Sequence, residues 1–247
     1  MEHQKGIGLP EILIGLLLAA LIMTGLMHQY LSTKQQFLHI QGALDASSEL
    51  QLVTDLIRES THKAGFTPCL SIHRLTTVDQ RDGHKNLFAI DVDTTIRPTL
   101  RINRMSDYFV EISQVLSPRT VLVSESQRFS YDHPVLISDC YHAEVQHIND
   151  IIQTKNGQVM TLDKPLAFEY QPPINIGEWV EEAFFIQTSQ WGKKGLFYQT
   201  HHTDELSPLV HTMSLYLQRY PDGTLLQVIL GLDNARTLTI DAMVRAS

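Results

Sequence analysis

Residues 1–30 read MEHQKGIGLPEILIGLLLAALIMTGLMHQY, and this stretch decides how the rest of the chain is organised. From Ile12 to Met27 no residue is charged, and with residues 7–10 the apolar stretch approaches the roughly 20 residues that a membrane-spanning helix needs. Glu11 interrupts the stretch near its start, with no basic residue beside it in the run. A carboxylate in hydrocarbon costs several kcal/mol unless it finds a partner, so Glu11 needs an explanation.

The composition predicts one globular domain with an N-terminal appendage. The chain has 247 residues, of which 43% are hydrophobic and 19% charged, so it can bury a core. Lys and Arg number 19 against 27 Asp and Glu, and they form no basic stripe, so nucleic acid is not expected as a partner.

The residues around the apolar stretch predict its orientation. Lys5 is the sole Lys or Arg before the stretch, so the short end should stay cytoplasmic while the rest is exported. An ordinary secretory signal would end in a small-residue A-x-A site, and HQYLSTKQQF after Met27 offers none. A simple signal anchor explains the hydrophobicity but leaves Glu11 unexplained.

The run from Lys5 to Glu11, KGIGLPE, followed by the apolar segment, resembles the class III signal of type IV prepilins and type II secretion pseudopilins. The resemblance implies that a dedicated peptidase cuts after Gly6, that Ile7 becomes the N-methylated terminus, and that Glu11 becomes the fifth mature residue. The chain departs from the common pattern at Ile7, where Phe is usual, and at Pro10, where an aliphatic residue is usual. Proline is tolerated in the first turn of a helix, because its missing N–H would lack an intrahelical acceptor there.

This resemblance gives Glu11 a role in assembly. In the family, the glutamate is thought to meet the terminal amine of a neighbouring subunit inside the apolar core of a filament, so that two charges that are costly alone become tolerable as a pair. The alternative is an incidental acid at a helix start, where the helix dipole favours a negative charge.

Beyond the apolar run, the pattern predicts a single long helix whose second half packs on a globular head. Apolar residues recur at helical spacing, namely Ile40, Leu44, Leu52 and Leu56, with Val53 and Ile57 beside them. Three signals mark the helix end: basic residues in the last turn, Gly65, which can adopt the left-handed backbone conformation, and the following Pro68. We therefore predict a leader at 1–6, a stalk helix at 7–64 that spans a membrane at 7–28, and a head at 65–247. A helix from about Glu11 to Ala64 would reach roughly 80 Å at 1.5 Å per residue.

Two cysteine segments narrow the resemblance. LVTDLIRESTHKAGFTPC, which ends at Cys69, and VLISDCYHAEVQHI, which contains Cys140, are similar to segments of the PilW-like minor pilins. Two cysteines are too few for a disulfide scaffold and lack zinc or C-x-x-C spacing. Because the head should be exported, we expect one Cys69–Cys140 disulfide rather than two reduced thiols.

The head is predicted to be an antiparallel, β-rich domain, which makes the fold class α+β. Short alternating or β-branched runs follow Cys69, separated by Asp-Gly, Asn-Gly, Pro-Pro and Ser-Pro. The strongest hairpin signal is YPDGTLLQVILGL, with Pro221, Asp222 and Gly223 between two apolar runs.

The head offers no motif that predicts catalysis or metal binding. No known ligand spacing joins His201 and His202 to His211, or His142 to His147. Adjacent residues of a strand point to opposite faces, which argues against His201 and His202 sharing an ion. Asp91 and Asp93 lack the continuation of a calcium loop.

The acidic and aromatic residues of the head predict neither a catalytic site nor a ligand groove. The neighbouring Glu181 and Glu182 should diverge on a strand, so they do not predict a catalytic pair. The aromatic residues are expected in the core rather than in a ligand groove; they are Trp179, Trp191, Phe184 and Phe185. No enzyme activity, metal or cofactor is expected.

The sequence leads to the hypothesis of a minor pilin that resembles PilW. Its expected partners are other minor pilins, the major pilin, the prepilin peptidase and methyltransferase, the inner-membrane assembly platform, and lipid before assembly. The expected location is the inner membrane with the head in the periplasm, and then the pilus. The alternatives are a J-type minor pseudopilin of type II secretion and a permanently anchored periplasmic binding protein or enzyme.

Overall fold

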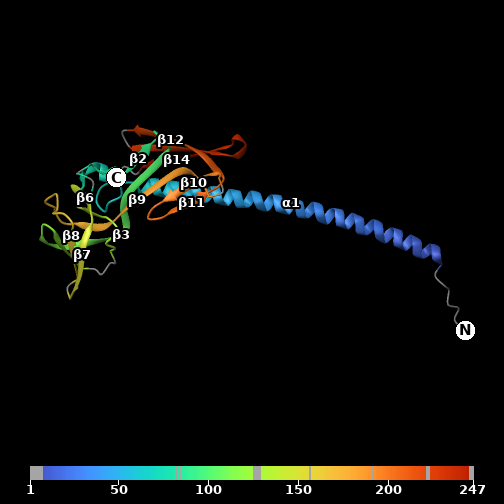
Figure 1. The fold of residues 1–247 in the computed structure, drawn as a ribbon, viewed down its shortest axis with the longest axis horizontal. Coiled ribbons are helices and arrows are strands. Elements are labelled where there is room, and N and C mark those ends of the chain that lie inside the picture. Colours follow the sequence, from blue (N-terminus) through green and yellow to red (C-terminus); the bar gives the residue numbers. More distant parts are fainter. Residues whose placement is uncertain are drawn as a thin grey trace. The chain divides into compact units, whose positions relative to one another are not determined.

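The computed structural model describes residues 8–81, 83, 85–124, 129–155, 157–190, 192–220 and 223–244, with the backbone alone described at Glu11 and Asn234. The fold is α+β, with one long apolar helix followed by a mixed, largely antiparallel β head (Figure 1). The chain divides into two compact units, Met1–Gln51 and Leu52–Ser247, and the division falls inside the helix.

Helix α1 spans Leu9–Lys63, a length of 55 residues, and Pro10 lies in its first turn as expected. The helix ends where the sequence predicted, because Gly65 adopts a left-handed φ of 70°. A Cβ atom on Gly65 would lie 2.8 Å from Ala89 Cβ and 2.8 Å from Ser71 Oγ, so this position requires glycine for space as well as for conformation.

The last turns of the helix pack on the head through one face. Val53 and Ile57 are fully buried, whereas Ile40, Leu44 and Leu52 remain 61%, 62% and 61% exposed. The predicted packing of the helix on the head is thus seen at Val53 and Ile57, which belong to the same compact unit as the head. The buried face starts at Val53 and continues through Ile57 and Thr61, one position round the helix from the stripe that the apolar spacing suggested.

The larger sheet of the head has eleven strands. Its main path runs β1-β6-β5-β9-β3-β4-β8-β7, with β2 beside β3, β10 beside β9 and β11 beside β10. Strands β1 and β6 pair in parallel, and the other pairs are antiparallel. The strands are β1 (Thr76–Asp79), β2 (Ile90–Asp93), β3 (Thr99–Ser117), β4 (Thr120–Val123), β5 (Val135–Ser138), β6 (His142–Gln146), β7 (Ile148–Thr154), β8 (Gly157–Leu162), β9 (Asn175–Thr188), β10 (Lys194–Gln199) and β11 (Thr203–Ser207).

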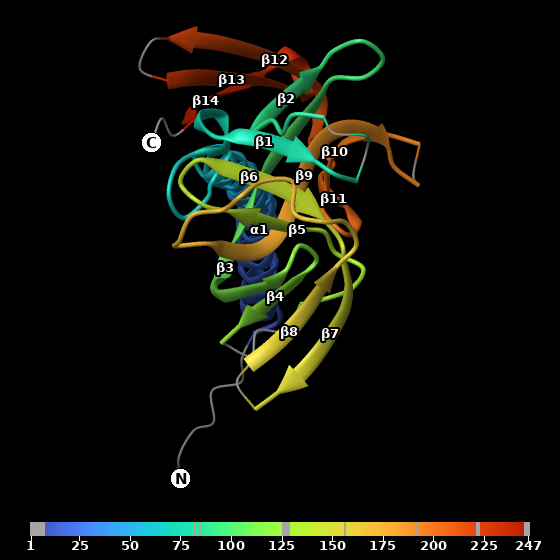
Figure 2. The same cartoon turned by 90° about the vertical axis from the view of Figure 1, so that its left-hand side faces the viewer.

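A second, three-stranded sheet is formed by β12 (Val210–Tyr220), β13 (Gly223–Leu232) and β14 (Thr237–Val244). The predicted hairpin is confirmed, since β12 and β13 pair from Val210↔Leu232 to Tyr220↔Gly223. Its turn residues Pro221 and Asp222 lie outside the described residues. The three-stranded sheet and the β7–β8 hairpin lie at opposite ends of the head (Figure 2). Two short 3-10 helices complete the fold, at Ile72–Arg74 and Asp233–Ala235.

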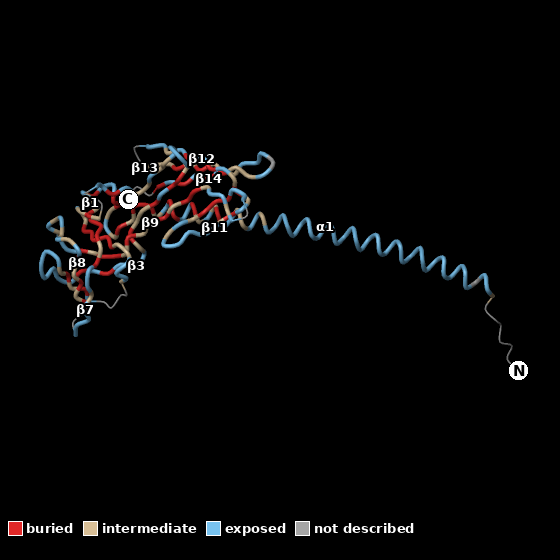
Figure 3. The backbone as a smooth tube through the Cα atoms, in the orientation of Figure 1, coloured by how far each residue is buried: buried red, intermediate tan, exposed pale blue. Residues whose placement is uncertain are grey.

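The head has a continuous buried interior along its strands, which Figure 3 colours red. One apolar cluster gathers side chains of β3, β4, β5, β8 and β9 around Ile112, Met160 and Ile176. A second cluster is built around Trp179, with Met105 and Leu136. The burial of these side chains supplies the main driving force for folding of the head.

Candidate functional site

The first half of α1 is the most apolar and most exposed part of the described chain. Its most hydrophobic 18-residue window has a mean hydropathy of 2.0 and is 0% buried. Successive side chains point in different directions and all remain exposed, with Leu16, Leu17 and Leu18 at 63%, 63% and 54%. Of the helices described, α1 alone is long and apolar enough to cross a membrane.

An apolar surface on every side of a helix implies surroundings that are apolar on every side. Thr24, a polar residue within this stretch, satisfies its hydroxyl inside the helix by donating to the Ala20 carbonyl at 2.7 Å. The stretch therefore has few polar side-chain groups that would need hydrogen bonds from water. It is compatible with a membrane anchor.

The three residues predicted to govern processing and assembly lie at the edge of the described chain. Glu11 is the third residue of α1, so its backbone lies in the first helical turn. Gly6 and Ile7 lie outside the described residues. The predicted cleavage and the predicted charge pair therefore remain predictions.

At its other end, α1 is attached to the head by buried and charged contacts. Val53, Ile57 and Thr61 are fully buried, and the Thr61 hydroxyl is satisfied within the helix by donating to the Ile57 carbonyl at 2.7 Å. Lys63 Nζ lies 2.7 Å from Asp107 Oδ2 and 3.0 Å from Glu59 Oε1. The hydrogen bond to Asp107, and then that to Glu59, raise the pKa of Lys63. Because the carboxylate partners are at least half exposed, the buried side chains contribute more to this attachment than the ion pairs do.

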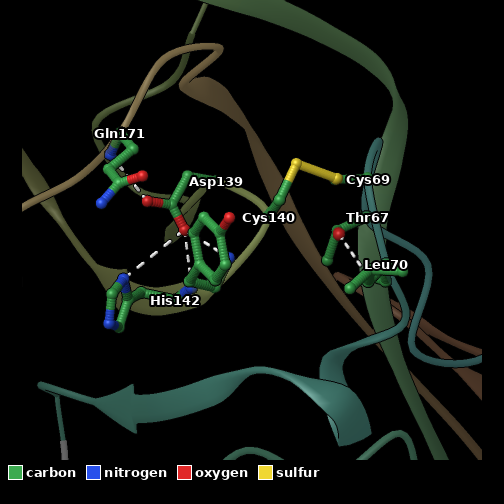
Figure 4. Close-up of a disulfide and its surroundings, with 8 residues drawn as sticks. Thr67, Cys69, Leu70, Asp139, Cys140, His142 and Gln171 are labelled. Carbon is green, nitrogen blue, oxygen red and sulfur yellow. Dashed lines mark hydrogen bonds and ion pairs between the residues drawn. A yellow bond between two sulfur atoms is a disulfide. The ribbon is translucent and has the colours of Figure 1, made fainter.

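The predicted disulfide is present just after the helix end. Cys69 and Cys140 are bonded, with 5.2 Å between their Cα atoms and 71 positions between them in sequence. Figure 4 shows the bond joining the segment after α1 to the turn that precedes β6. On the α1 side, the Thr67 hydroxyl donates to the Leu70 carbonyl at 2.5 Å, and Gly65 N–H donates to the Asn103 carbonyl at 2.8 Å. The bond therefore ties the segment that follows the helix to the turn between β5 and β6.

Asp139 organises the other side of the disulfide. Its buried carboxylate accepts backbone N–H groups from Tyr141 at 2.7 Å, His142 at 2.6 Å and Gln171 at 2.8 Å (Figure 4). Burial alone raises the pKa of Asp139, but these N–H donors and the nearby His142 outweigh it and hold the pKa below its ordinary value. The sequence analysis missed this role, although Asp before a turn is a common signal for a side chain that caps backbone N–H groups.

Glu144 is a second buried carboxylate that the sequence analysis missed. It is fully buried in β6 and accepts hydrogen bonds from Gln80 Nε2 at 3.1 Å, Gln146 Nε2 at 2.6 Å and Ala167 N–H at 2.6 Å. Burial raises its pKa above the ordinary value, and the hydrogen bonds only partly oppose that rise. The network holds the segment around Ala167 against the sheet, which is a structural role.

The acidic residues considered in the sequence have separate partners. Glu181 Oε1 lies 2.8 Å from Arg81 Nη2, whereas Glu182 Oε1 lies 3.1 Å from Arg104 Nη2, so the two neighbouring acids diverge as predicted. Asp91 pairs with Arg101 at 3.0 Å. Asp93 accepts the Thr95 N–H at 2.9 Å and the Thr95 hydroxyl at 2.6 Å.

Three of the histidines named in the sequence analysis have partners other than a second histidine of their own group. His211 Nε2 lies 3.0 Å from Asp233 Oδ1, and the His142 ring stacks on Phe168 with 4.7 Å between ring centroids. His201 lies beside Glu178, with 3.1 Å between Nε2 and Oε1.

The predicted core aromatics are buried, with Trp179 at 2%, Phe184 at 0% and Phe185 at 2% exposure. Trp191 lies outside the described residues.

Comparison of the chain with family models, with curated proteins and with solved structures gave no match. Its function is therefore argued from its own residues.

Proposed function

We propose that this chain is a minor pilin of a type IV pilus, similar to the PilW-like subunits, which contributes to the start of assembly and to the structure of the filament or its tip. The observation that carries the proposal is the position of Glu11. It follows Gly6 by five residues and lies in the first turn of a helix in which the next sixteen residues, 12–27, carry no charge. An anchor needs the apolar residues alone. A carboxylate at the start of the apolar segment is useful if it can form an ion pair with a cation at that position.

Cleavage after Gly6 would supply that cation. It would make the Ile7 amine the new terminus, four positions before Glu11. In a bundle of such helices, the amine of one subunit and the carboxylate of its neighbour neutralise each other in an apolar core. Pairing then favours one axial register, because any other register leaves both charges buried and unpaired.

The head is suited to an exposed role outside the cytoplasm. The disulfide at the base of the head is typical of a protein that folds in an oxidising compartment. In this proposal the subunit waits in the inner membrane with its head in the periplasm. Its partners in the filament are the major pilin and other minor pilins.

The proposal is tested by substituting Glu11 and following the subunit into sheared filaments. Glu11→Ala should leave cleavage and membrane insertion intact, and should lower the amount of subunit per filament by about tenfold or more, since an unpaired buried amine costs at least 1.4 kcal/mol. Asp45→Ala is the matched control, because it removes an exposed acid from the same helix.

The result separates the proposal from a permanent anchor. If Glu11→Ala and Asp45→Ala enter filaments as well as the unsubstituted chain does, the charge-pair account is wrong. If the unsubstituted chain is never found in filaments and keeps its leader, the chain is an anchored periplasmic protein.

A further inference from the structure

Three side chains that are far apart in sequence meet on the head at Glu178. His133 Nδ1 lies 2.7 Å from Glu178 Oε1, and His201 Nε2 lies 3.1 Å from the same oxygen. The two imidazole rings stack, with 3.8 Å between centroids and 6° between planes. One donor atom from each of the three residues lies within 4.8 Å of the other two.

The backbone fixes each of these residues in place. Glu178 belongs to β9 and lies opposite Val135 of β5, while Trp179 N–H donates to the Pro134 carbonyl at 2.8 Å, which positions the segment that carries His133. His201 lies in the turn between β10 and β11, which Thr200 N–H closes by donating to the His202 carbonyl at 3.0 Å. Glu178 therefore stands on a strand, His201 in a short turn, and His133 two residues before the start of β5, so that paired backbone holds or adjoins each donor.

The glutamate oxygen between the rings lacks a hydrogen bond. Oε1 of Glu178 is buried and has no hydrogen-bond partner among the described residues, although two ring nitrogens lie within ion-pair distance. The nitrogens approach the oxygen without the alignment that a hydrogen bond needs. A buried carboxylate oxygen without a donor is costly, so a cation is the missing partner that the chemistry suggests.

We propose that His133, Glu178 and His201 bind a divalent first-row transition ion, for which zinc is the natural candidate. Two imidazole nitrogens and one carboxylate oxygen are a common zinc ligand set, with bonds of about 2.0–2.2 Å. Ligands at that distance in a tetrahedron are about 3.3 Å apart, so the three donors need to move by about an ångström. The two stacked rings must also turn out of their parallel arrangement, because an imidazole nitrogen binds a metal in the plane of its ring.

The site has room for a further ligand. The side chains of His133 and Glu178 are each 33% exposed and that of His201 is 46% exposed, so an ion can enter from solvent and keep a water molecule in its fourth position. The bound ion would join the β10–β11 turn to the segment before β5. It would stabilise the head in proportion to its occupancy.

This inference does not depend on the pilin proposal, and no local sequence pattern predicts it. The ligands come from positions 133, 178 and 201, with no short ligand spacing between any two of them. His202, which the sequence pairs with His201, is exposed and is not one of the three clustered ligands.

The test is a titration of the full chain, purified in detergent without a histidine tag and stripped with a chelator, with zinc ion alone. We expect one ion per chain by calorimetry and a rise in the melting temperature of the head. His133→Ala and Glu178→Gln should each weaken binding by about 100-fold or more, because each removes a ligand. His202→Ala, the neighbouring control, should bind as the unsubstituted chain does.

Cobalt provides a second readout that does not depend on any variant. Cobalt ion in the site should give the strong visible absorption of a tetrahedral complex, and zinc should displace it. Variants whose metal-free melting curves match that of the unsubstituted chain are used for the comparison. Two results would show that the cluster is only a histidine–glutamate ion pair. One is that the unsubstituted chain neither binds an ion stoichiometrically nor gives the cobalt spectrum, and the other is that folded His133→Ala binds equally well.

Discussion

The two ends of α1 belong to one continuous helix and have opposite surroundings. Leu17 and Leu21 near the beginning are 63% and 62% exposed, whereas Val53 and Ile57 near the end are fully buried. The first end is apolar on all sides, and the second buries one narrow face that includes the polar Ser60 and Thr61. Apolar side chains of α1 therefore fall into two groups. Those at the second end pack in the core of the head, and those at the first end are exposed and suit an apolar environment outside the chain.

The difference separates the residues that stabilise the head from those to which the proposal assigns membrane insertion and assembly. Substitutions in the buried end should act on folding of the head, and substitutions in the apolar end should act on membrane or filament association. Four expectations separate these effects.

The largest effect is expected from charges in the apolar end. Leu17→Arg combined with Leu21→Arg places two cations on one face, at a cost of about 5–7 kcal/mol for membrane insertion. The protein should leave the membrane fraction on cell fractionation. Leu52→Arg, at a position that is 61% exposed, is the control and should remain in that fraction. If the double variant stays membrane-bound, the apolar end is not the anchor.

The next effect concerns the disulfide at the base of the head. Replacing both cysteines by serine should lower the unfolding free energy of the head by about 4 kcal/mol, because the bond closes a loop of 71 residues in the unfolded chain. Denaturant titration in detergent measures the loss. A reductant should destabilise the unsubstituted chain equally and leave the double serine variant unchanged; equal stability of all three samples would contradict the expectation.

A single buried side chain of α1 should matter somewhat less. Ile57→Ala should cost about 3 kcal/mol of unfolding free energy, because it leaves a cavity where the side chain was fully buried. Leu52→Ala, on the same helix but 61% exposed, should change it by less than about 0.5 kcal/mol. Similar losses from the two substitutions would mean that the buried face is assigned wrongly.

The smallest effect is a dependence on pH at Asp139. Because the folded chain holds the pKa of Asp139 below its ordinary value of 3.8, ionised Asp139 stabilises the head fully above that value, and the contribution is lost as pH falls through the folded pKa. Asp139→Asn should cost about 1.5 kcal/mol at neutral pH and flatten the acid limb of the stability curve. Asp241→Asn, at an exposed position, should leave the curve unchanged.

Much of this architecture follows from local sequence signals. The helix end at Gly65, the Cys69–Cys140 bond and the β12–β13 hairpin were predicted because each depends on a few neighbouring residues or on the compartment. The alternating runs LRINRM and YFVEISQVL read locally as two strands, but they form one strand, β3, whose pairing with β9 is irregular between Met105 and Phe109.

What the sequence did not predict depends on tertiary contacts. Strand β6 is buried on both faces, and two of its buried residues, Glu144 and Gln146, are polar, so it lacks the alternation that marks a strand. Its parallel partner β1 is short and mostly polar, and β7 and β11 were missed as well. The cluster at His133 depends on three distant segments, which no local pattern can connect.

We propose that α1 mediates assembly after cleavage removes the leader. The identity of the first residue of the mature protein tests this proposal most directly. Mass spectrometry of the protein purified from cell membranes should find Ile7 as the first residue, with one methyl group on its amine. A protein that begins at Met1, or at any residue other than Ile7, would contradict the account.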